Sequence, residues 1–443
     1  MLQETGPIRT REVLEKYEEE RLSCYALKSS RARRLIDVSS EGRLFDYRTE
    51  FQRDRDRIIY SRAFRRLRNK ASISHITDED HGRDRLNHTL EVSQIARTLG
   101  RGLSLNEDLI EAISLAHDLG VPPFGEAAEK TLDSILKGRI LEGLTEIKTD
   151  LYGFARNKQS LRVVDLLEKR YEHEGLNLTS DTREGIVKQG EKGKDMAYPD
   201  MIKEGLHPGL APSFEAQVVF IADEIATQIE SADDGLRCGI IELKEAERLA
   251  LVRELIKKIG KRYTALRGRY MKIASINRGL THLLVTNVIC HSLQALSRWA
   301  EKNGVCSTER FYQSRETISG NEISFPPRVK KMFGEFWDFI SSRTAYTFHT
   351  QRVRERAKRI IEGLFMAYYR NPLILEDYLL LRYREIRGVK FLRDIPGKRM
   401  GKEIVRYKKD PRFVRLICDH IAGMTDNYAR QEYEKLNLEY HKG

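Results

Sequence analysis

The sequence contains few of the residues and patterns that mark several common protein classes. It has five cysteines in 443 residues, and no two of them form a C-x-x-C pair. This argues against a zinc–thiolate site and favours free, buried thiols in a reducing compartment. The chain has no apolar run of the roughly 18 residues that a membrane-spanning helix needs, and its first residues lack the apolar centre of a secretory signal. We therefore expect a cytoplasmic protein without a membrane partner.

Several catalytic signatures are missing as well. The sequence has no Walker A motif, no G-x-S-x-G elbow and no pattern typical of a cysteine nucleophile. Positive charge, in contrast, is abundant. The chain has 78 Lys and Arg residues and 66 Asp and Glu residues, which gives a net charge of +12. Such a balance favours nucleotides, polyphosphate or nucleic acid as partners. A solvated surface rich in Lys and Arg explains the same charge equally well.

Apolar residues recur at helical spacing along most of the chain, which predicts a predominantly helical protein. We expect helices at 11–26, 50–70, 86–103, 107–119, 214–232, 243–260, 279–301, 328–340, 350–370 and 411–436. Segments 183–200, 319–327 and 387–403 are rich in glycine, proline or polar residues and predict loops. Any strand is short, and the best position for one is 70–76.

Three of the predicted helices contain residues that suit one divalent metal ion. His88 ends the sequence RLNH, His117 is followed directly by Asp118, and Asp223 lies in IADEIA. Ionisable side chains among apolar helix residues are costly unless they are paired or coordinate an ion. Imidazole and carboxylate ligands suit Mn, Fe, Co, Ni or Zn, and Mg when several waters complete the shell. The pattern alone is short, and a solvent-facing Asp223 beside Glu224 is the alternative.

The longer motifs around these residues extend over nearly the whole chain. They are YRTEFQRDRDRIIYSRAFRRL (47–67), DHGRDRLNHTLEVSQIART (80–98), ISLAHDLGVPPFGEAAE (113–129), GFARNKQSLRVVDLLE (153–168), GLNLTS (175–180), the segment 214–237 and LICDHIAGMTDNYARQEYEKL (416–436). In these motifs the chain resembles the HD-domain superfamily, and within it the bacterial dGTPase-like deoxynucleoside triphosphate triphosphohydrolases. The resemblance implies an all-α, HD-domain helical fold with additional C-terminal helices. Residues 1–240 would form the HD-type metal and nucleotide domain, and residues 241–443 a helical C-terminal extension packed on it as one continuous unit.

The resemblance also implies a reaction and a ligand set. The family's metal ligands match His88, His117, Asp118 and Asp223, and its reaction splits a deoxynucleoside triphosphate into a deoxynucleoside and intact tripolyphosphate. The metal polarises a phosphate oxygen and lowers the pKa of water, while basic residues neutralise the triphosphate. Arg85 matches the family's phosphate-contacting arginine.

Further expectations about the substrate and the partners follow from the same resemblance. Gln159 falls in the family's substrate-pocket segment, and His81 matches a position near the pocket. The family implies a homo-oligomer, in which arginines of segment 53–70 would contact a nucleotide effector between subunits. The basic segment 387–403 is the better candidate for single-stranded DNA, although it lacks closely spaced aromatic residues for base stacking.

The sequence departs from the family in the reactive pocket. The family has histidines where this chain has Val121, Glu126 and Arg156. Valine cannot transfer a proton, and general acid help at such a position is commonly worth about 10²–10⁴-fold in rate. Arg156 can bind phosphate but is too basic to transfer protons. Glu126 can act as a base, hold a cation or repel a triphosphate.

Three further positions concern the substrate and the proton chemistry. Thr227 stands where the family has a tyrosine near the sugar, which relaxes the expected sugar selection. Ser231 replaces an acidic residue, whereas Glu129 keeps an acidic position of the family. We expect Arg85, Gln159 and Thr227 to contact the substrate, and Glu126, Glu129 and Arg156 to assist the reaction.

Three interpretations fit these departures. The chain is a dGTPase-like hydrolase with rearranged chemistry, a phosphohydrolase with another nucleotide substrate, or a largely inactive regulatory protein that binds nucleotides or single-stranded DNA. The retained metal ligands argue against complete loss of the site, because an unused site has no evident reason to keep them.

Overall fold

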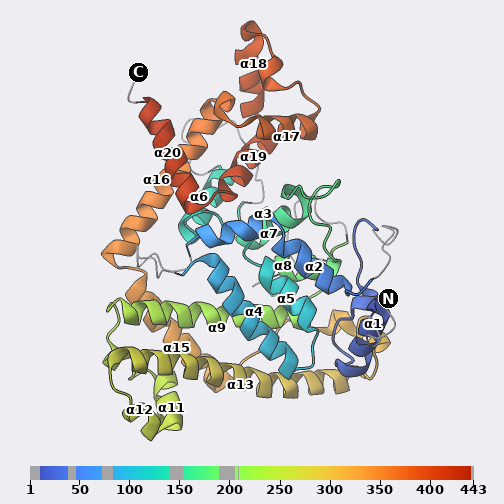
Figure 1. Ribbon diagram of the computed structural model, residues 1–443, viewed down its shortest axis with the longest axis vertical. Helices are drawn as coiled ribbons and strands as arrows, with labels where there is room; N and C mark the ends of the chain where they lie inside the picture. The colour runs from blue at the N-terminus through green and yellow to red at the C-terminus, as the bar shows by residue number, and fades with distance from the viewer. Residues whose placement is uncertain are drawn as a thin grey trace, which may run out of the picture.

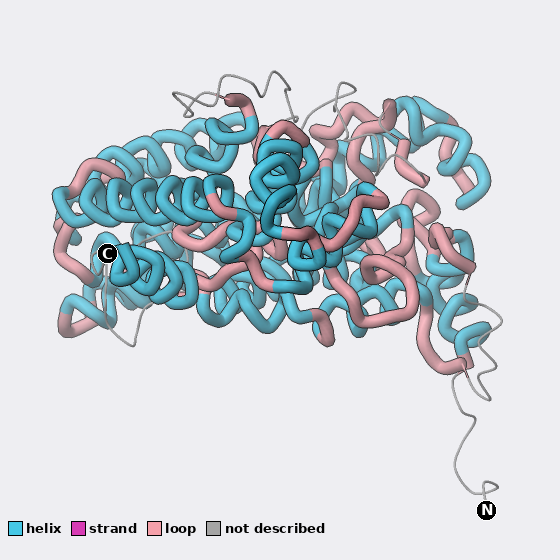
Figure 2. The backbone as a smooth tube through the Cα atoms, turned by 90° about the horizontal axis from the view of Figure 1, so that it is seen from above, coloured by secondary structure: helices cyan, strands magenta, loops and turns pink. Residues whose placement is uncertain are grey.

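The computed structural model describes residues 10–37, 46–71, 83–138, 153–188, 205–207 and 209–440. Helices dominate these residues, and no strand occurs among them (Figure 2). Extended pairing within the same ranges is limited to isolated bridges, such as the one between Ala71 and Asp84. The expectation of an all-α fold is therefore confirmed.

The helices fall along the described chain in the following order. They are α1 Arg11–Arg21, α2 Glu50–Ile59, α3 Arg62–Arg66, α4 Arg85–Gly102, α5 Glu107–Ala116, α6 Glu126–Leu136, α7 Arg156–Arg162, α8 Ser180–Val187, α9 Phe214–Arg237, α10 Leu243–Ala246, α11 Ala250–Ile259, α12 Lys261–Thr264, α13 Arg269–Asn303, α14 Thr308–Ser314, α15 Pro327–Thr344, α16 Phe348–Arg370, α17 Asp377–Arg387, α18 Gly397–Lys408, α19 Pro411–Ala422 and α20 Asp426–Tyr440. Short helical turns lie at Ser29–Arg31, Leu67–Asn69, Val163–Leu167, Arg315–Thr317, Pro372–Ile374 and Leu392–Asp394.

Three expected helices are interrupted. Segment 50–70 divides into α2, α3 and a turn, because the Ser61 hydroxyl accepts from the backbone N–H of Phe64 at 3.0 Å and starts a new helix. Segment 411–436 divides into α19 and α20, where the Thr425 hydroxyl accepts from the N–H of Tyr428 at 3.2 Å. Segment 243–260 divides into α10 and α11. Side-chain caps of this kind satisfy the free N–H groups at a new helix start, and apolar spacing does not reveal them.

Of the three predicted loops, one is confirmed, one is wrong in part and one lies largely outside the described residues. Segment 387–403 was wrong in part, because α18 begins at Gly397, directly after Pro396. Segment 183–200 begins inside α8, and residues 189–200 lie outside the described ranges, as do residues 72–76 of the expected strand. Segment 319–327 is confirmed as the connection that precedes α15.

Helices α4, α5 and α9 pack against one another near the middle of the molecule (Figure 1). Each begins at a side-chain cap: Asp84 accepts from Asn87 N–H, Asn106 from Leu109 N–H, and Ser213 from Ala216 N–H. Helices α13 and α15 lie below α9 in Figure 1. Helix α16 runs upward past α6, against which it packs, and α17 and α18 lie at the top of the view.

Apolar side chains gather in three cores. The largest joins α4, α5 and α9 to α11, α13 and α15. The second joins α6 to α16, α17 and α19, and the third lies around α2, α5, α7 and α8. The first two cores contain residues from both sides of position 240. The division into residues 1–240 and a C-terminal extension, residues 241–443, stays a prediction.

Two smaller expectations can be compared with the structure. No helix in the described ranges is long and apolar enough to cross a membrane. The five cysteines are free, but the expectation that they are buried was wrong for most of them. Cys418 is buried, whereas Cys238, Cys290 and Cys306 are exposed.

Candidate metal centre

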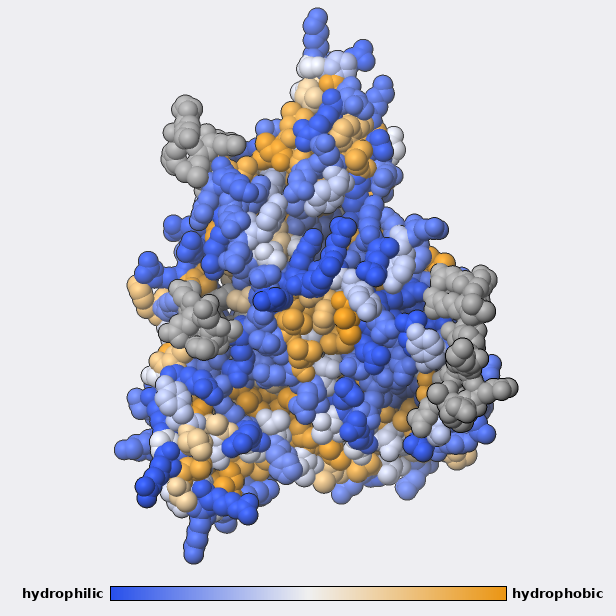
Figure 3. Space-filling view, viewed as in Figure 1, coloured by the Kyte–Doolittle hydropathy of each residue, from blue (hydrophilic) through white to orange (hydrophobic). Residues whose placement is uncertain are grey.

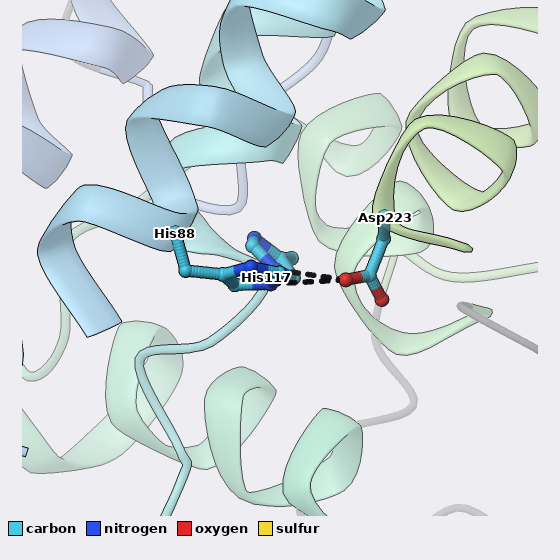
Figure 4. Close-up of side chains that lie close together, drawn as sticks. All are labelled: His88, His117 and Asp223. Carbon is cyan, nitrogen blue, oxygen red and sulfur yellow. Dashed lines mark hydrogen bonds and ion pairs between the residues drawn. The ribbon is translucent and has the colours of Figure 1, made fainter. Parts of the chain in front are cut away.

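Three predicted ligands converge from three different helices or helix ends. His88 lies in the first turns of α4, His117 at the end of α5 and Asp223 in the middle of α9. Their ligand atoms all lie within 4.8 Å of one another, and all three residues are buried. Figure 4 shows both imidazole rings pointing toward the Asp223 carboxylate, whose Oδ1 is 3.1 Å from Nε2 of His88.

Hydrogen bonds on the far side of each ring fix the orientation of the two histidines. The Nδ1 atom of His117 lies 2.6 Å from the carbonyl oxygen of Ser114. The Nδ1 atom of His88 lies 2.9 Å from Oε1 of Glu230, two turns beyond Asp223 on α9. An imidazole that donates through Nδ1 directs its Nε2 atom toward the centre, where a metal ion would take the place of a proton on that atom. This is the arrangement found behind metal-binding histidines in general.

Asp118 completes the group, although it is held differently. One of its oxygens, Oδ2, accepts from the guanidinium of Arg85 at 2.9 Å and lies 3.6 Å from Nε2 of His117. The other oxygen, Oδ1, is buried and has no hydrogen-bond partner in the described part of the chain, and the same holds for Nε2 of His117. Buried polar atoms without partners are costly. Two imidazoles and two carboxylates, including these two atoms without hydrogen-bond partners, fit a divalent cation such as Mn, Fe, Co, Ni, Zn or Mg.

The electrostatic environment keeps the two carboxylates ionised. Burial raises the pKa of Asp118, but the nearby His117 and Arg85 hold it well below its ordinary value. Burial likewise raises the pKa of Asp223, and its hydrogen bond with His88 holds it low. For His88, burial lowers the pKa, whereas the carboxylates of Asp223 and Glu230 raise it to about 10. The site therefore gathers negative charge in a buried place that favours a cation.

A pocket of about 610 Å³ opens beside this group. Its lining combines positive charge with polar and apolar side chains from α4, α6, α9, α15 and α16. The lining includes Arg85, Val121, Phe124, Gly125, Glu126, Glu129, Arg156, Thr227, Ser231, Trp337, Thr350 and Arg354. Pockets of a few hundred Å³ up to about 1,000 Å³ hold small-molecule ligands.

Most of the predicted pocket residues line this space. Arg156 is half-exposed at 41% of its side chain, and its guanidinium nitrogens lie 4.0 Å from Asp118 and 3.9 Å from Asp223. The Thr227 hydroxyl donates to Oδ1 of Asp223 at 3.3 Å. Val121 lies in the wall and is only 2% exposed.

The two glutamates differ in their surroundings. Glu126 is 61% exposed and pairs with Lys130 at 2.6 Å and with Arg354 at 3.4 Å. The hydrogen bond from Lys130 lowers the pKa of Glu126. Glu129 is more enclosed, its Oε1 accepts from the backbone N–H of Arg156 at 2.9 Å, and burial raises its pKa. Of the two glutamates, Glu129 therefore holds a proton more readily than Glu126.

Gln159 stands apart from this pocket. Gln159 is buried in α7, its Nε2 donates to Asp419 at 3.1 Å, and it lines a different cavity. Its role in substrate binding stays a prediction. His81 lies outside the described residues.

Sequence reasoning missed two residues that shape the site. Glu230 holds His88, and its spacing of seven residues from Asp223 places both on one face of α9, so this signal was available. Arg354 reaches the pocket from α16, more than 200 residues from the other lining residues of α4 and α6. No local sequence pattern predicts such a contact.

Comparison with known proteins agrees with this geometry. Residues 85–228 match the HD domain, and residues 397–435 match a phosphohydrolase-associated domain. The chain is 35% identical over 443 residues to a deoxyguanosinetriphosphate triphosphohydrolase-like protein of Syntrophus aciditrophicus, with 98% of each chain covered. Proteins of the same description are similar in Bartonella henselae (35% over 414 residues, 90% of this chain and 93% of the relative) and Nitrosomonas europaea (34% over 411 residues, 92% and 95%).

The fold and the site define a metal-dependent phosphohydrolase of the HD-domain class. Within that class, the chain belongs to the family of deoxyguanosinetriphosphate triphosphohydrolase-like proteins.

Proposed function

We propose that this protein hydrolyses deoxynucleoside triphosphates to a deoxynucleoside and tripolyphosphate. The observation that carries the proposal is the pocket beside the converging His88, His117 and Asp223, because three arginines line it: Arg85, Arg156 and Arg354. Guanidinium groups match phosphate oxygens in charge and geometry. The names of the similar proteins support a nucleotide of this class as the substrate.

In this proposal His88, His117, Asp118 and Asp223 hold one divalent metal ion. When bound, the ion supplies Lewis-acid polarisation of a phosphate oxygen and a lower pKa for water. Arg85 holds Asp118 in place through Nη1, while its Nη2 lies near Gly125 in the pocket wall. Arg156 and Arg354 line the same pocket and would neutralise the negative charge of the remaining phosphates.

Proton transfer falls to Glu129 rather than to Val121 or Glu126. Glu129 lines the pocket, and burial raises its pKa, which favours the protonated form more than at an exposed glutamate. Glu126 is held as an anion by Lys130 and Arg354, so its contribution would be to keep Arg354 in position. Thr227, which is shorter than the family's tyrosine, would leave more room beside the sugar.

One observation supports a second function, that of a nucleotide-binding protein with little catalysis. The Arg156 guanidinium lies 4.0 Å from Asp118 and 3.9 Å from Asp223, at the outer limit of an ion-pair distance. Its charge competes with a metal ion for the same carboxylates, and the buried wall at Val121 offers no acid. A nucleotide effector, single-stranded DNA and a homo-oligomer stay predictions for either function.

The deciding experiment incubates the purified full-length protein with Mn²⁺ or Mg²⁺ and each of the four deoxynucleoside triphosphates. We expect tripolyphosphate and deoxynucleoside in equal amounts, detected by phosphorus NMR and chromatography. Asp223→Ala removes one ligand and should abolish the products, whereas Glu224→Gln, the exposed neighbour on α9, should leave them.

The absence of turnover with every nucleotide and every metal of the group would sink the hydrolase proposal. Thermal stabilisation by a nucleotide without turnover would then support the binding protein, since a ligand that binds only the folded state stabilises it.

A further inference from the structure

One hydroxyl group in the wall of the metal-centre pocket has no partner in the described part of the chain. It belongs to Ser231, which lines the pocket, is only 4% exposed and has no hydrogen-bond partner for its Oγ atom. Hydrophilic side chains cover most of the face shown in Figure 3, so polar groups on the surface identify no ligand by themselves. A buried polar atom without a partner is a more specific signal, because a ligand that pairs with it recovers the free energy lost on its burial.

The other serine and threonine hydroxyls of this lining already have acceptors in the protein. Each donates at a distance between 2.9 and 3.3 Å to the Asp223 carboxylate or to a backbone carbonyl; they are Thr227, Ser341, Thr344 and Thr350. Among the described serines and threonines that line the pocket, Ser231 is therefore the one whose hydroxyl is left for a ligand.

Thr227 and Ser231 follow Asp223 along α9 by one and by two turns. With a helical rise of 1.5 Å per residue, they stand about 6 and 12 Å beyond Asp223 along the helix axis. They are the two residues that α9 contributes to the lining of the pocket, and neither is charged. The wall that continues from the metal centre along α9 is therefore made of small side chains that carry hydroxyl groups.

The positively charged side chains of the pocket come from its other walls. Arg85 belongs to α4, Arg156 to α7 and Arg354 to α16. In the proposed reaction the α-phosphate lies at the metal centre and the remaining phosphates lie at these arginines. The sugar is joined to the α-phosphate through one oxygen and one methylene group, so it lies next to the metal centre and against the uncharged wall of α9.

We propose that this pocket accepts ribonucleoside triphosphates as well as deoxynucleoside triphosphates, with the 2′-hydroxyl of the ribose hydrogen-bonded to Ser231. The inference rests on the proposed hydrolysis and names a wider class of substrate for the same site. Small side chains at positions 227 and 231 leave room for the additional oxygen, and that oxygen supplies the partner that the Ser231 hydroxyl lacks. Water adds to the α-phosphorus, the bond to the 5′-oxygen breaks, and that oxygen takes a proton, which releases a ribonucleoside and tripolyphosphate.

Calorimetric titration of the full-length protein in chelator compares the affinity of each ribonucleoside triphosphate with that of its 2′-deoxy counterpart in the absence of turnover. We expect the ribonucleotide of at least one pair to bind no more weakly than its counterpart. Ser231→Ala should lower the ratio of ribonucleotide to deoxynucleotide affinity about 3- to 10-fold, the usual effect of one hydrogen bond between uncharged groups. Ser297→Ala removes an exposed hydroxyl from α13 and should leave this ratio unchanged.

Turnover with Mn²⁺ gives a second measurement of sugar selection. Chromatography of the released nucleosides should show kcat/KM for the ribonucleotide of that pair within about tenfold of the value for its deoxy counterpart. Thr227→Tyr places a ring in the wall of α9 and takes up the space beside the sugar. This variant should therefore lower the ratio of ribonucleotide to deoxynucleotide kcat/KM by about tenfold or more.

The possible outcomes separate this inference from the proposed hydrolysis. A preference of more than about tenfold for the deoxynucleotide of every pair overturns the inference and leaves the hydrolysis standing. Ratios that change in neither Ser231→Ala nor Thr227→Tyr also overturn it, because the wall of α9 then does not contact the sugar. If no nucleotide is hydrolysed, the proposed function fails and the affinity ratios alone decide the inference, and if none binds either, both are wrong.

Discussion

At the scale of single residues, the candidate metal centre includes side chains that lie behind the proposed ligands. Glu230 contacts Nδ1 of His88 at 2.9 Å and is itself buried. A carboxylate in this position fixes the ring and raises the basicity of the imidazole. Position 121 shows the opposite case, a place in the pocket wall where a side chain able to transfer protons is missing.

Glu230→Gln should weaken the binding of Mn²⁺ about 10- to 100-fold, the usual cost of removing such a support. Isothermal titration measures the affinity. Glu224→Gln removes the same charge from an exposed site on α9 and should change the affinity less than threefold. Equal losses in the two variants would show that overall charge, rather than the contact with His88, sets the affinity.

Val121→His should raise the turnover of a deoxynucleoside triphosphate by roughly 10²–10⁴-fold, because it restores a group that can protonate the leaving oxygen. Steady-state release of tripolyphosphate gives the rate. Val121→Asn introduces polarity without a comparable acid and serves as the control. A histidine variant no faster than the asparagine variant would contradict a role for proton transfer at this position.

At the scale of elements, α9 combines a metal ligand with a structural anchor at its start. Glu215 is buried in the first turn and accepts from the backbone N–H groups of Leu27 and Asn106 at 2.9 and 3.4 Å. Its Oε2 has no hydrogen-bond partner in the described ranges, and burial raises its pKa from 4.5 to about 7. The sequence predicted α9 within a few residues, but not this anchor, because the contacts come from residues over 100 positions away.

Glu215 should make folding less favourable as the pH rises. The protonated carboxyl contributes fully below pH 4.5, and the contribution is lost as the pH rises to about 7. A shift of that size corresponds to on the order of 3 kcal/mol. Glu215→Gln resembles the protonated form, so its free energy of unfolding should exceed that of the parent at pH 8 and match it near pH 4.5, as urea titrations would measure. The same pH slope in both proteins would assign the dependence to other groups.

At the scale of the whole molecule, the C-terminal helices support the metal centre directly. Asp426, at the start of α20, accepts from Phe124 N–H at 2.9 Å and from Ala71 N–H at 3.0 Å. Phe124 has a φ of 63°, which is unfavourable for a residue with a side chain, and this turn leads from the metal ligands into α6. The phosphohydrolase-associated region, residues 397–435, thus holds a strained turn of the HD region.

Asp426→Asn should lower the free energy of unfolding by about 1–3 kcal/mol, because one of the two acceptor oxygens becomes an NH2 donor and leaves one backbone N–H group without an acceptor. We also expect weaker metal binding, since the turn at Phe124, which follows Asp118, loses one of the hydrogen bonds that hold it in place. Urea titration and calorimetry measure the two effects. Asp377→Asn, which breaks an exposed pair with Arg393, should cost less than 1 kcal/mol. Unchanged metal affinity in Asp426→Asn would separate the turn from the centre.

The sequence by itself determined the helical class and the positions of the main helices, because helical periodicity and long local motifs are properties of neighbouring residues. It also predicted the residues that we propose as metal ligands. It also located the replaced positions Val121, Glu126 and Arg156. Only the tertiary structure decided that Glu129 is more enclosed than Glu126, that Gln159 lines a second cavity and that Arg354 enters the pocket. Those outcomes depend on which distant helices pack together, and burial, charge pairing and pocket shape are set by that packing rather than by any local pattern.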